Sequence, residues 1–345
     1  MKTQVIRAMF CAAAFALMST FSFAAGAETP DDGARPVPAG VDIAAVQKAA
    51  ERGLAFIHSQ QNKDGSWGSG SYSRDVGITA LAAMAMMSQG NVPGSGKYGD
   101  DVQKGVLFIL RNVNDNTGFI GTGPNSRMYS HGFAALCLAE AYGMMQNESL
   151  PDKLKKAIRL IIRAQKPDGG WRYDPLPTGQ SDLSVTVCQV MALRAARNAG
   201  IKIPKNVIDQ AITYVKKSAN ADGSFRYMLS EGSGKSYALT AAGITTLFGA
   251  GEYDSDELKK GLEYLKQAGA NDFSHYFYGH YYAAQAMYLA GGQYWDDWFL
   301  KMTTELLRKQ QADGSWTGEI GEVYCTAMAC IVLQIHNCYL PIFQR

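Results

Sequence analysis

Apolar residues divide most of the chain into helical segments of two alternating kinds. Segments of the first kind are amphipathic, with charged residues on one side of the helical period and apolar residues every three or four positions on the other. They lie at 43–61, 99–113, 150–165, 203–218, 254–268 and 295–311. Segments of the second kind are apolar on nearly all sides, as in Ile78–Met86, and a helix of this composition lies inside a protein. The alternation predicts helix pairs with one solvent-facing and one buried member.

A short phrase recurs between the two members of a pair. It reads QNKDGSW at Gln61–Trp67, QKPDGGW at Gln165–Trp171 and QADGSW at Gln311–Trp316, with weaker copies at 116–119, 220–225 and 271–273. The Asp-Gly pair predicts a tight turn, because glycine tolerates a positive φ, and the aromatic residue after it is expected to pack on a neighbouring helix. A spacing of about fifty residues, shortening to about forty near the end, indicates a repeat architecture.

Alternating amphipathic and apolar helices form either an open solenoid or a closed double ring with the apolar helices inside. The chain has six units, its last unit carries a complete phrase, and no polar capping repeat is evident. These features favour closure. We therefore predict an all-α fold, an (α/α)6 toroid with six outer and six inner helices around a central cavity.

The repeated Gln-x-x-Asp-Gly-Ser/Gly-Trp phrase, placed ahead of small apolar helices, resembles the repeats of the squalene–hopene cyclase and protein prenyltransferase β-subunit superfamily. The similarity extends over about residues 43–335. The resemblance implies the α/α toroid of that superfamily. It does not imply one chemistry, because the same fold serves cyclases, prenyltransferases, polysaccharide lyases and non-enzymatic binders.

The N-terminal segment has the features of a secretory signal. Lys2 and Arg7 form a short basic start, and an apolar run follows them. The small residues at 25–27 suit a signal peptidase, so we expect cleavage near Ala27, with Ala24 as the alternative. No later segment approaches the roughly twenty consecutive apolar residues of a membrane span. We expect a soluble mature protein, periplasmic or secreted. The predicted parts are a signal peptide at 1–27, a flexible leader at 28–41, a single toroid at 42–338 and a C-terminal tail at 339–345.

Charge and cysteine content narrow the possible partners. A formal net charge of +2 gives no indication of a nucleic-acid partner or an acidic membrane surface. Five cysteines follow the predicted cleavage site, and an odd number leaves at least one thiol free even in an oxidising compartment. Buried small side chains are the favoured interpretation of most of them. We predict no cofactor, no metal, no nucleic acid and no stable membrane insertion, whereas a protein partner remains open.

The starts of the inner helices are expected to surround one end of the cavity. Superposing their apolar patterns predicts one equivalent position in each repeat: Asp75, Ser130, Asp182, Ser236, Tyr278 and Glu322. Carboxylates and hydroxyls at helix starts cap backbone N–H groups and interact well with the helix dipole, which by itself explains these residues. The alternative is that polar groups converging at the mouth of an apolar pocket form a ligand site.

Two histidines beside these positions are candidates for acid–base work. His131 lies at the head of an inner helix, and His280 lies in the densest aromatic stretch, 275–282. A lone histidine at a helix start is more often structural, whereas two facing one cavity would favour proton transfer. Glu140, inside an apolar run, needs a partner if it is buried, so it is either a structural hydrogen-bonding residue or a site residue. The predicted catalytic candidates are Asp182, His131 and His280, and the predicted ligand-binding residues are Asp75, Arg127, Tyr237, Tyr278, Tyr281 and Glu322.

The chemistries of the resembling family find little support in these residues. Squalene–hopene cyclases protonate an alkene with an acid from an Asp-x-Asp-Asp motif, and the corresponding segment, Gln180–Leu183, has one aspartate. Protein prenyltransferases hold zinc with an Asp, a nearby Cys and a distant His. His280 could match the distant histidine, but the segment at 235–238 lacks the Asp-x-Cys element. Proton-initiated cyclisation and zinc-dependent prenyl transfer are both disfavoured.

Three functions therefore remain open, and whether the protein is an enzyme stays undecided. The first is a cavity protein that binds an apolar ligand such as an isoprenoid, and a purely aromatic cavity would favour it. The second is a secreted polysaccharide lyase or hydrolase, with Tyr278, His280, His131 or Arg127 as chemical groups and a long groove lined by Arg and Lys. The third is a non-enzymatic ring that binds proteins in the cell envelope, favoured by a cavity plugged by its own side chains.

Overall fold

The computed structural model describes residues 35–123, 127–230, 232, 234–268 and 274–344. Within these residues the chain forms twelve α-helices and no β-strand. The outer helices are α2 (Ile43–Ser59), α4 (Gly99–Arg111), α6 (Leu150–Ala164), α8 (Lys205–Lys217), α10 (Asp256–Ala268) and α12 (Gly292–Lys309). The inner helices are α3 (Val76–Met87), α5 (Met128–Ala141), α7 (Leu183–Asn198), α9 (Tyr237–Ala250), α11 (Tyr276–Ala290) and α13 (Glu322–Gln334). The predicted signal peptide at 1–27 and the weak phrase at 271–273 lie outside the described residues.

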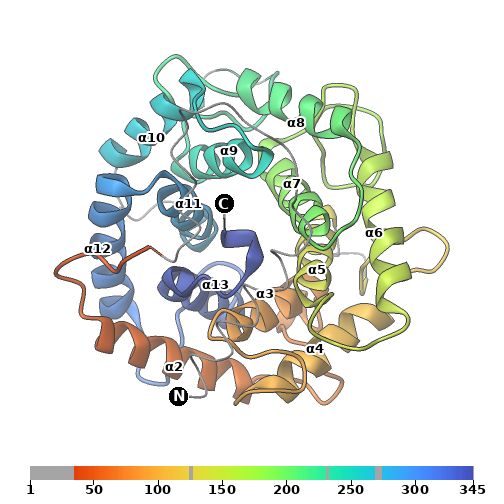
Figure 1. The fold of residues 1–345 in the computed structure, drawn as a ribbon, viewed down its shortest axis with the longest axis vertical. Helices are drawn as coiled ribbons and strands as arrows, with labels where there is room; N and C mark the ends of the chain where they lie inside the picture. Colours follow the sequence, from red (N-terminus) through yellow and green to blue (C-terminus); the bar gives the residue numbers. More distant parts are fainter. Residues whose placement is uncertain (1–34, 124–126, 231, 233, 269–273, 345) are drawn as a thin grey trace, which may run out of the picture. The chain divides into compact units, whose positions relative to one another are not determined.

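Residues 35–344 form two concentric rings of helices (Figure 1). Each inner helix packs against the next, and α13 packs against α3, which closes the inner ring. The outer ring closes where α12 contacts α2. Every residue of α3 is buried, as expected for a helix that is apolar on all sides and packed between two inner neighbours and the outer ring. The predicted all-α (α/α)6 toroid is confirmed.

The repeated phrase fastens each outer helix to the following inner helix. The indole of Trp67 is buried and donates to the carbonyl oxygen of Ile57 near the end of α2 (2.7 Å), while its backbone N–H donates to Oγ1 of Thr79 in α3 (3.0 Å). Gly65 forms the turn with a φ of 89°, and a Cβ atom there would lie 2.4 Å from the carbonyl oxygen of Lys104. The aspartate-glycine turn therefore presses directly against the next outer helix, where only glycine fits.

The same bonds recur in the other complete copies. The indoles of Trp171 and Trp316 donate to Ile161 and Leu306, and their backbone N–H groups donate to Thr186 and Thr326. The glutamine that opens the last copy is Gln310 and not Gln311, because Gln310 Nε2 donates to the carbonyl oxygens of Ala49 and Gly314, as Gln61 does to Asp101 and Gly65. The bond to Ala49 joins the last repeat to the first and helps to close the ring.

The C-terminal tail enters the centre of the inner ring. After α13 the chain forms the 3₁₀-helices η2 (Ile335–Asn337) and η3 (Pro341–Phe343), and its end lies inside the ring (Figure 1). We call residues 338–344 the tail plug. Its side chains Leu340, Ile342 and Phe343 are at most 3% exposed. The tail plug therefore fills the ring at the end where the inner helices have their C-termini.

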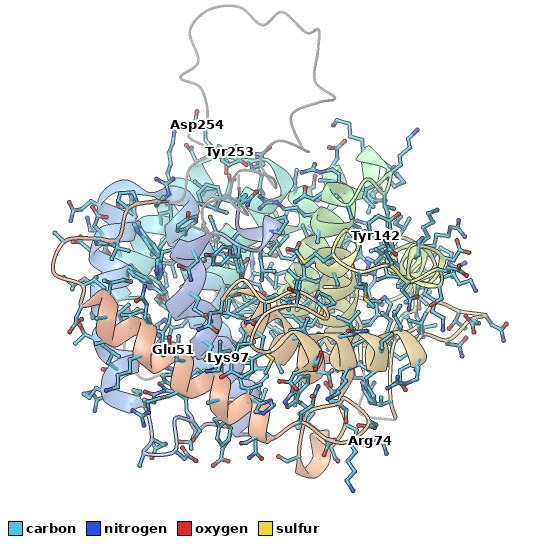
Figure 2. The ribbon with its side chains drawn as sticks, turned by 60° about the horizontal axis from the view of Figure 1, so that its bottom comes forward. Glu51, Arg74, Lys97, Tyr142, Tyr253 and Asp254 are labelled. Carbon is cyan, nitrogen blue, oxygen red and sulfur yellow. The ribbon has the colours of Figure 1, made fainter. Side chains whose placement is uncertain are left out.

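The two ends of the inner helices lie on opposite faces of the ring. Arg74, which precedes α3, lies on one face, whereas Tyr142 and Tyr253, which follow α5 and α9, lie toward the other (Figure 2). The described part of the predicted leader is attached to the ring, since the backbone N–H of Arg35 donates to the Tyr288 hydroxyl (3.0 Å).

The apolar core holds the cysteines as well as the aliphatic side chains. None of the five cysteines in the described residues forms a disulfide, and four of them are buried.

No helix in that part of the chain combines the length and the apolar character needed to span a bilayer.

Candidate functional site

A cavity of about 1100 Å³ opens at the end of the ring where the inner helices begin. Much of its lining comes from the second and third residues of these helices, which follow the capping residues. The lining residues at these positions are Gly77, Ile78, Tyr129, Ser130, Ser184, Ala238, Leu239, Phe277, Tyr278 and Tyr324. All six inner helices therefore contribute to one hollow.

The capping residues are largely occupied by their own helices. Asp75 accepts hydrogen bonds from the backbone N–H groups of Gly77 (2.8 Å) and Ile78 (3.0 Å), and its second oxygen accepts one from Ser130 Oγ (3.0 Å). Asp182 accepts from the N–H of Val185 (2.8 Å) and is fully buried. Asp75 still reaches the cavity lining, whereas Asp182 lies behind it.

Aromatic residues from the connecting loops complete the wall. Tyr173 and Tyr227 each follow the aromatic residue of the phrase by two positions, and both line the cavity. Tyr72 and Trp316 add further aromatic surface. Our sequence analysis did not predict any of these four residues at the cavity and named Trp316 only as part of the repeated phrase. The tyrosine two positions after Trp171 and Phe225 was the signal that could have identified two of them.

A layer of aromatic side chains forms the floor of the cavity. Phe133 lines the cavity and makes an edge-to-face contact with Tyr281, with ring centroids 5.9 Å apart. Tyr281 is 2% exposed and lies behind Phe133, outside the lining where we predicted a ligand contact. The hydroxyl of Tyr282 lies 3.2 Å from Cys188 Sγ in α7. Contacts across the ring therefore close the cavity from below.

A hydrogen-bonded group of hydroxyls covers one side of the cavity. The hydroxyl of Tyr129 donates to Ser184 Oγ, and Ser184 Oγ donates to Asp182 Oδ1 (2.7 Å). The hydroxyl of Tyr278 donates to the carbonyl oxygen of Ser184 (2.9 Å). We call Tyr129, Ser184 and Tyr278 the hydroxyl cluster. The neighbouring hydroxyls of Tyr173 and Tyr227 are bonded to each other (2.7 Å).

Burial controls the protonation of Asp182. Burial raises the pKa of its carboxyl group, and the hydrogen bonds from Val185 and Ser184 oppose that rise only in part. A carboxylic acid with a raised pKa is a weaker acid and a poorer donor to an alkene. The segment aligned with the Asp-x-Asp-Asp motif, Gln180–Leu183, has Asp182 as its one aspartate, and this residue lies behind the cavity lining. The residue beside it that lines the cavity is Ser184.

Besides Asp75, the charged side chains of the lining come from the end of α12 and from the loops beside α11 and α13. Lys309 Nζ lies 4.4 Å from the ring centroid of Tyr276 and 3.5 Å from Glu305. His275 Nδ1 lies 3.2 Å from Glu319, and both side chains are exposed. These opposite charges offset one another, so the lining as a whole is aromatic and neutral in character.

His131 lies between the rings and not at the cavity. Its Nδ1 accepts a hydrogen bond from the N–H of Ile120 (3.1 Å), and its Nε2 lies 3.3 Å from the carbonyl oxygen of Ala157. Burial lowers the pKa of His131 to about 4, so the imidazole is neutral at pH 7. We expected a side chain facing the cavity, but the backbone of neighbouring segments holds both ring nitrogens.

His280 occupies an aromatic pocket between α11, α9 and α12. Its ring centroid lies 4.5 Å from Tyr276, 5.4 Å from Tyr237 and 6.1 Å from Trp298. Burial lowers the pKa of His280 to about 3. Tyr237, which we also predicted to face the cavity, instead accepts a hydrogen bond from Trp298 Nε1 (3.0 Å). Neither residue is part of the cavity lining.

The two remaining predicted residues lie on the surface. Arg127 forms an exposed ion pair with Asp174 (2.7 Å), and Glu322, the first residue of α13, is exposed. Of the nine predicted site residues, the structure brings Asp75 and Tyr278 to the cavity. In the described ranges, no three His, Cys, Asp or Glu side chains are grouped in a way that could hold a metal ion.

Comparison with known proteins supports the resemblance inferred from the repeats. Residues 129–275 match the family model of the squalene-hopene cyclase C-terminal domain. No curated protein matches the sequence. The resemblance to the terpenoid cyclase superfamily is confirmed. The matched residues include the phrase copies at 165–171 and 220–225 and the lining residues Tyr129, Ser184 and Tyr227.

Solved structures share the toroid at low sequence identity. The type II terpene cyclase MstE from Scytonema (apo) is 14% identical with a TM-score of 0.62, covering 87% of this chain and 100% of that chain. An inactive variant of the α-1,6-mannanase GH76A of Salegentibacter sp., in complex with α-1,6-mannotriose, is 5% identical with a TM-score of 0.64, covering 85% and 99%. An α-amylase from Clostridium perfringens is 9% identical with a TM-score of 0.61, covering 83% and 97%. These identities show the fold alone.

Proposed function

We propose that this protein is an exported binding protein that encloses an apolar ligand, of isoprenoid type, in the cavity at the mouth of the inner ring. The observation that carries the proposal is the lining: about 1100 Å³ of space walled mainly by aromatic and aliphatic side chains and closed below by Phe133. A cavity of this size suits a molecule of some twenty or more carbon atoms, and apolar surface buried there stabilises the complex by roughly 25 cal/mol per Å².

Binding without cyclisation is the better supported activity. Protonation of an alkene needs a strong acid in contact with the substrate. Ser184 occupies the cavity-facing position, and Asp182 behind it is buried with a raised pKa. The aromatic faces would stabilise a cation through their quadrupoles, but no group in the hydroxyl cluster is acidic enough to generate one.

Polysaccharide cleavage has weaker support from the same lining. A glycosidase needs two carboxyl groups facing the sugar. The carboxylates that reach the cavity are Asp75, which is committed to the start of α3, and Glu319, which is exposed and paired with His275. A lyase needs cations along its groove, and the lysine and arginine of this lining, Lys309 and Arg308, lie together at one edge. A protein-binding ring would hold no small molecule in the cavity, and detection of a bound molecule distinguishes this function from the other two.

The predicted signal peptide supports the proposed location in the periplasm or outside the cell. Export would place the protein among envelope lipids, which include isoprenoid compounds with long apolar chains. Fractionation of the producing cells, followed by N-terminal sequencing of the mature protein, tests this part. A mature chain that starts near residue 28 in the exported fraction is expected, and an uncleaved cytosolic chain would contradict it.

The central test is direct detection of a bound molecule. Native mass spectrometry of protein purified from its own envelope is expected to show a complex, and organic extraction is expected to release a lipid. In parallel, purified protein is titrated with geranylgeraniol while the fluorescence of Trp316, which lines the cavity, is followed. Leu239→Trp fills part of the cavity and is expected to weaken binding at least about tenfold, or roughly 1.4 kcal/mol. Ala44→Trp, on the exposed side of α2, serves as the matched control.

The outcomes separate the three functions. Loss of binding in Leu239→Trp but not in Ala44→Trp, with both proteins folded by circular dichroism, supports the proposal. If Leu239→Trp does not fold, Ile78→Trp provides a second change in the cavity wall. Binding of a mannan oligosaccharide in place of the isoprenoid would favour the glycan function. If neither assay detects a bound small molecule, the non-enzymatic protein-binding ring is the function that remains.

A further inference from the structure

The protons of the hydroxyl cluster are all committed within the protein. Ser184 Oγ has one proton and gives it to Asp182 Oδ1. The contact between Tyr129 and Ser184 Oγ therefore uses the phenol proton of Tyr129. Tyr278 gives its proton to the carbonyl oxygen of Ser184. Both phenol oxygens retain lone pairs and have no proton left to donate, so the cluster offers acceptors alone.

Burial keeps this pattern unchanged near neutral pH. Burial raises the pKa of Tyr129 and of Tyr278 well above the ordinary value of 10, so neither phenol becomes a phenolate. Asp182 behind Ser184 has an acceptor oxygen facing the serine proton. Asp75 and Asp182 cap the positive ends of α3 and α7, whereas the ends of α5 and α11, which carry the two phenols, have no side-chain cap.

The two phenols are close enough to serve one ligand group. Tyr129 is the second residue of α5 and Tyr278 is the third residue of α11, on different sides of the ring. Their rings stand edge to face, with centroids 6.4 Å apart and an interplanar angle of 87°. Both hydroxyls bond to atoms of the same residue, Ser184. Both tyrosines line the cavity on the side of Phe133, where its apolar part begins. A ligand whose body fills the aromatic part can therefore place one polar end between them.

Anions do not suit this position. The carboxyl group of Asp182, which accepts the Ser184 proton, would repel a phosphate or a carboxylate, although the positive charge of Arg172 also acts on this carboxyl group. The guanidinium of Arg172 lies over the ring of Tyr173 and contacts Met228 Sδ, and Arg172 is not part of the lining. The lysine and arginine of the lining come from the end of α12. Lys309 lies over the ring of Tyr276, two residues before Tyr278, and Glu305 pairs with it there.

We propose that the hydroxyl cluster selects an apolar alcohol, whose one hydroxyl proton is shared between the phenol oxygens of Tyr129 and Tyr278 in a three-centre hydrogen bond. This inference rests on the proposed function, because it names the polar end of the ligand that the cavity encloses. The alcohol oriented in this way points its hydrocarbon body toward Phe133 and the aromatic wall. A ligand such as an ether has an oxygen but no proton to donate. Its oxygen would face the two phenol oxygens with no hydrogen bond between them, which is unfavourable.

The test compares ligands of one hydrocarbon body and different polar ends. Geranylgeraniol, its methyl ether, the corresponding carboxylic acid and the corresponding primary amine are titrated at pH 7 against the full mature protein. We expect the alcohol to bind about tenfold more tightly than the ether, because the ether cannot donate, and the acid to bind most weakly. Alcohol and ether bound equally well would overturn the selection of an alcohol and leave the proposed function intact. Binding of none of the four would overturn the proposed function itself.

Variants of the cluster tie the preference to its cause. In the double variant Tyr129→Phe with Tyr278→Phe, both acceptors are lost, and the ratio of alcohol to ether affinity is expected to fall to about one while the ether still binds. Tyr339→Phe, an exposed tyrosine in the tail plug, is the matched control and is expected to keep the wild-type ratio. If the double variant does not fold, Tyr278→Phe alone is expected to reduce the ratio. Persistence of the full ratio in a folded variant, or tighter binding of the amine than of the alcohol, would overturn the proposal.

Discussion

The two ends of the inner ring are built from the same six helices but end in different ways. At the helix N-termini a cavity of about 1100 Å³ remains open to the outside. At the helix C-termini the chain returns and fills the ring with its own tail plug, whose Leu340 is fully buried. The fold by itself would allow a channel through the ring. The tail plug and the aromatic floor at Phe133 fill the ring beyond the cavity, so the cavity lies at the end where the inner helices begin.

Buried charged groups at the two ends differ accordingly. At the closed end, Glu140 accepts a hydrogen bond from the backbone N–H of Ile342 (3.4 Å), and Arg194 donates to the carbonyl oxygen of Gln344. Both side chains hold the tail plug, so their role is structural. At the open end, Asp182 holds Ser184 and through it the hydroxyl cluster. A buried carboxyl group thus supports the cavity wall at the mouth and holds the tail plug at the other end.

The largest effect is expected from removal of the tail plug. Deleting residues 338–345 exposes the pocket that holds Leu340, Ile342 and Phe343, and these side chains each contribute about 1.5–3 kcal/mol when fully buried, offset by the entropy of the ordered tail. We expect the free energy of unfolding in urea to fall by about 3 kcal/mol. Binding at the mouth is expected to stay within about twofold, because Phe133 and Tyr281 separate the two ends. Loss of ligand binding in a folded deletion variant would show that the tail plug supports the cavity and that the two ends of the ring are not independent.

A smaller effect concerns the pH dependence set by Glu140. Burial raises its folded pKa from 4.5 to about 8. Between about pH 6.5 and 8 the folded protein keeps this proton and the unfolded chain has lost it, so the free energy of unfolding falls as pH rises, by about 2 kcal/mol over this window. Glu140→Gln is expected to remove that fall while keeping an acceptor for Ile342. Urea titrations of both proteins across the window provide the measurement, and parallel curves would show that Glu140 does not titrate there.

At the open end, Ser184→Ala is expected to cost about 1 kcal/mol of folding free energy. The change removes the donor to Asp182 Oδ1 and the acceptor for Tyr129, so one side of the hydroxyl cluster loses its partners. Thr317, which also lines the cavity but from a loop, provides the comparison as Thr317→Ala, with an expected loss below about 0.5 kcal/mol. Thermal unfolding of the two variants measures the difference. Equal losses would mean that Ser184 has no special place in the wall.

The smallest effect is expected at Arg127. Its ion pair with Asp174 is exposed on both sides, and such pairs contribute between zero and about 0.5 kcal/mol. Arg127→Ala should therefore leave both unfolding and ligand affinity nearly unchanged, measured by the same urea and fluorescence titrations. A tenfold loss of ligand affinity would show that Arg127 contacts the ligand and that the binding site extends beyond the residues lining the cavity.

The fold was predictable because its signals are local and repeated. The Asp-Gly turn and the following tryptophan appear in the sequence as a phrase, and each copy makes the same bonds, from Trp67 to Thr79 and from Trp171 to Thr186. Repetition at one spacing leaves few arrangements other than a ring or a solenoid. The bounds of the outer helices were predicted to within three residues, as in α6, predicted at 150–165 and found at Leu150–Ala164.

Of the six helix-start positions predicted to surround the cavity, Asp75, Ser130, Ser236 and Tyr278 line it. In α7 and α13 the lining residues are Ser184 and Tyr324, two positions after the predicted Asp182 and Glu322. The helix starts were identified in the sequence by residues such as Asp75 and Asp182, which do cap α3 and α7. Capping turns the side chain back toward its own helix, so the wall is formed instead by residues such as Ser184 and Tyr129. The histidines mark a different error, since His131 and His280 point outward between the rings.

The sequence by itself determined the helix pairs, the turns that join them and the resemblance to the terpenoid cyclase superfamily, because these depend on residues close together in the chain. Only the tertiary structure decided which side chains share the cavity, that the tail plug closes its far end, and that the phenols of Tyr129 and Tyr278 meet at Ser184. The physical reason is rotation about the helix axis: neighbouring residues on a helix point about 100° apart, so a shift of one residue moves a side chain from the cavity to the core. Packing of the complete ring sets that rotation.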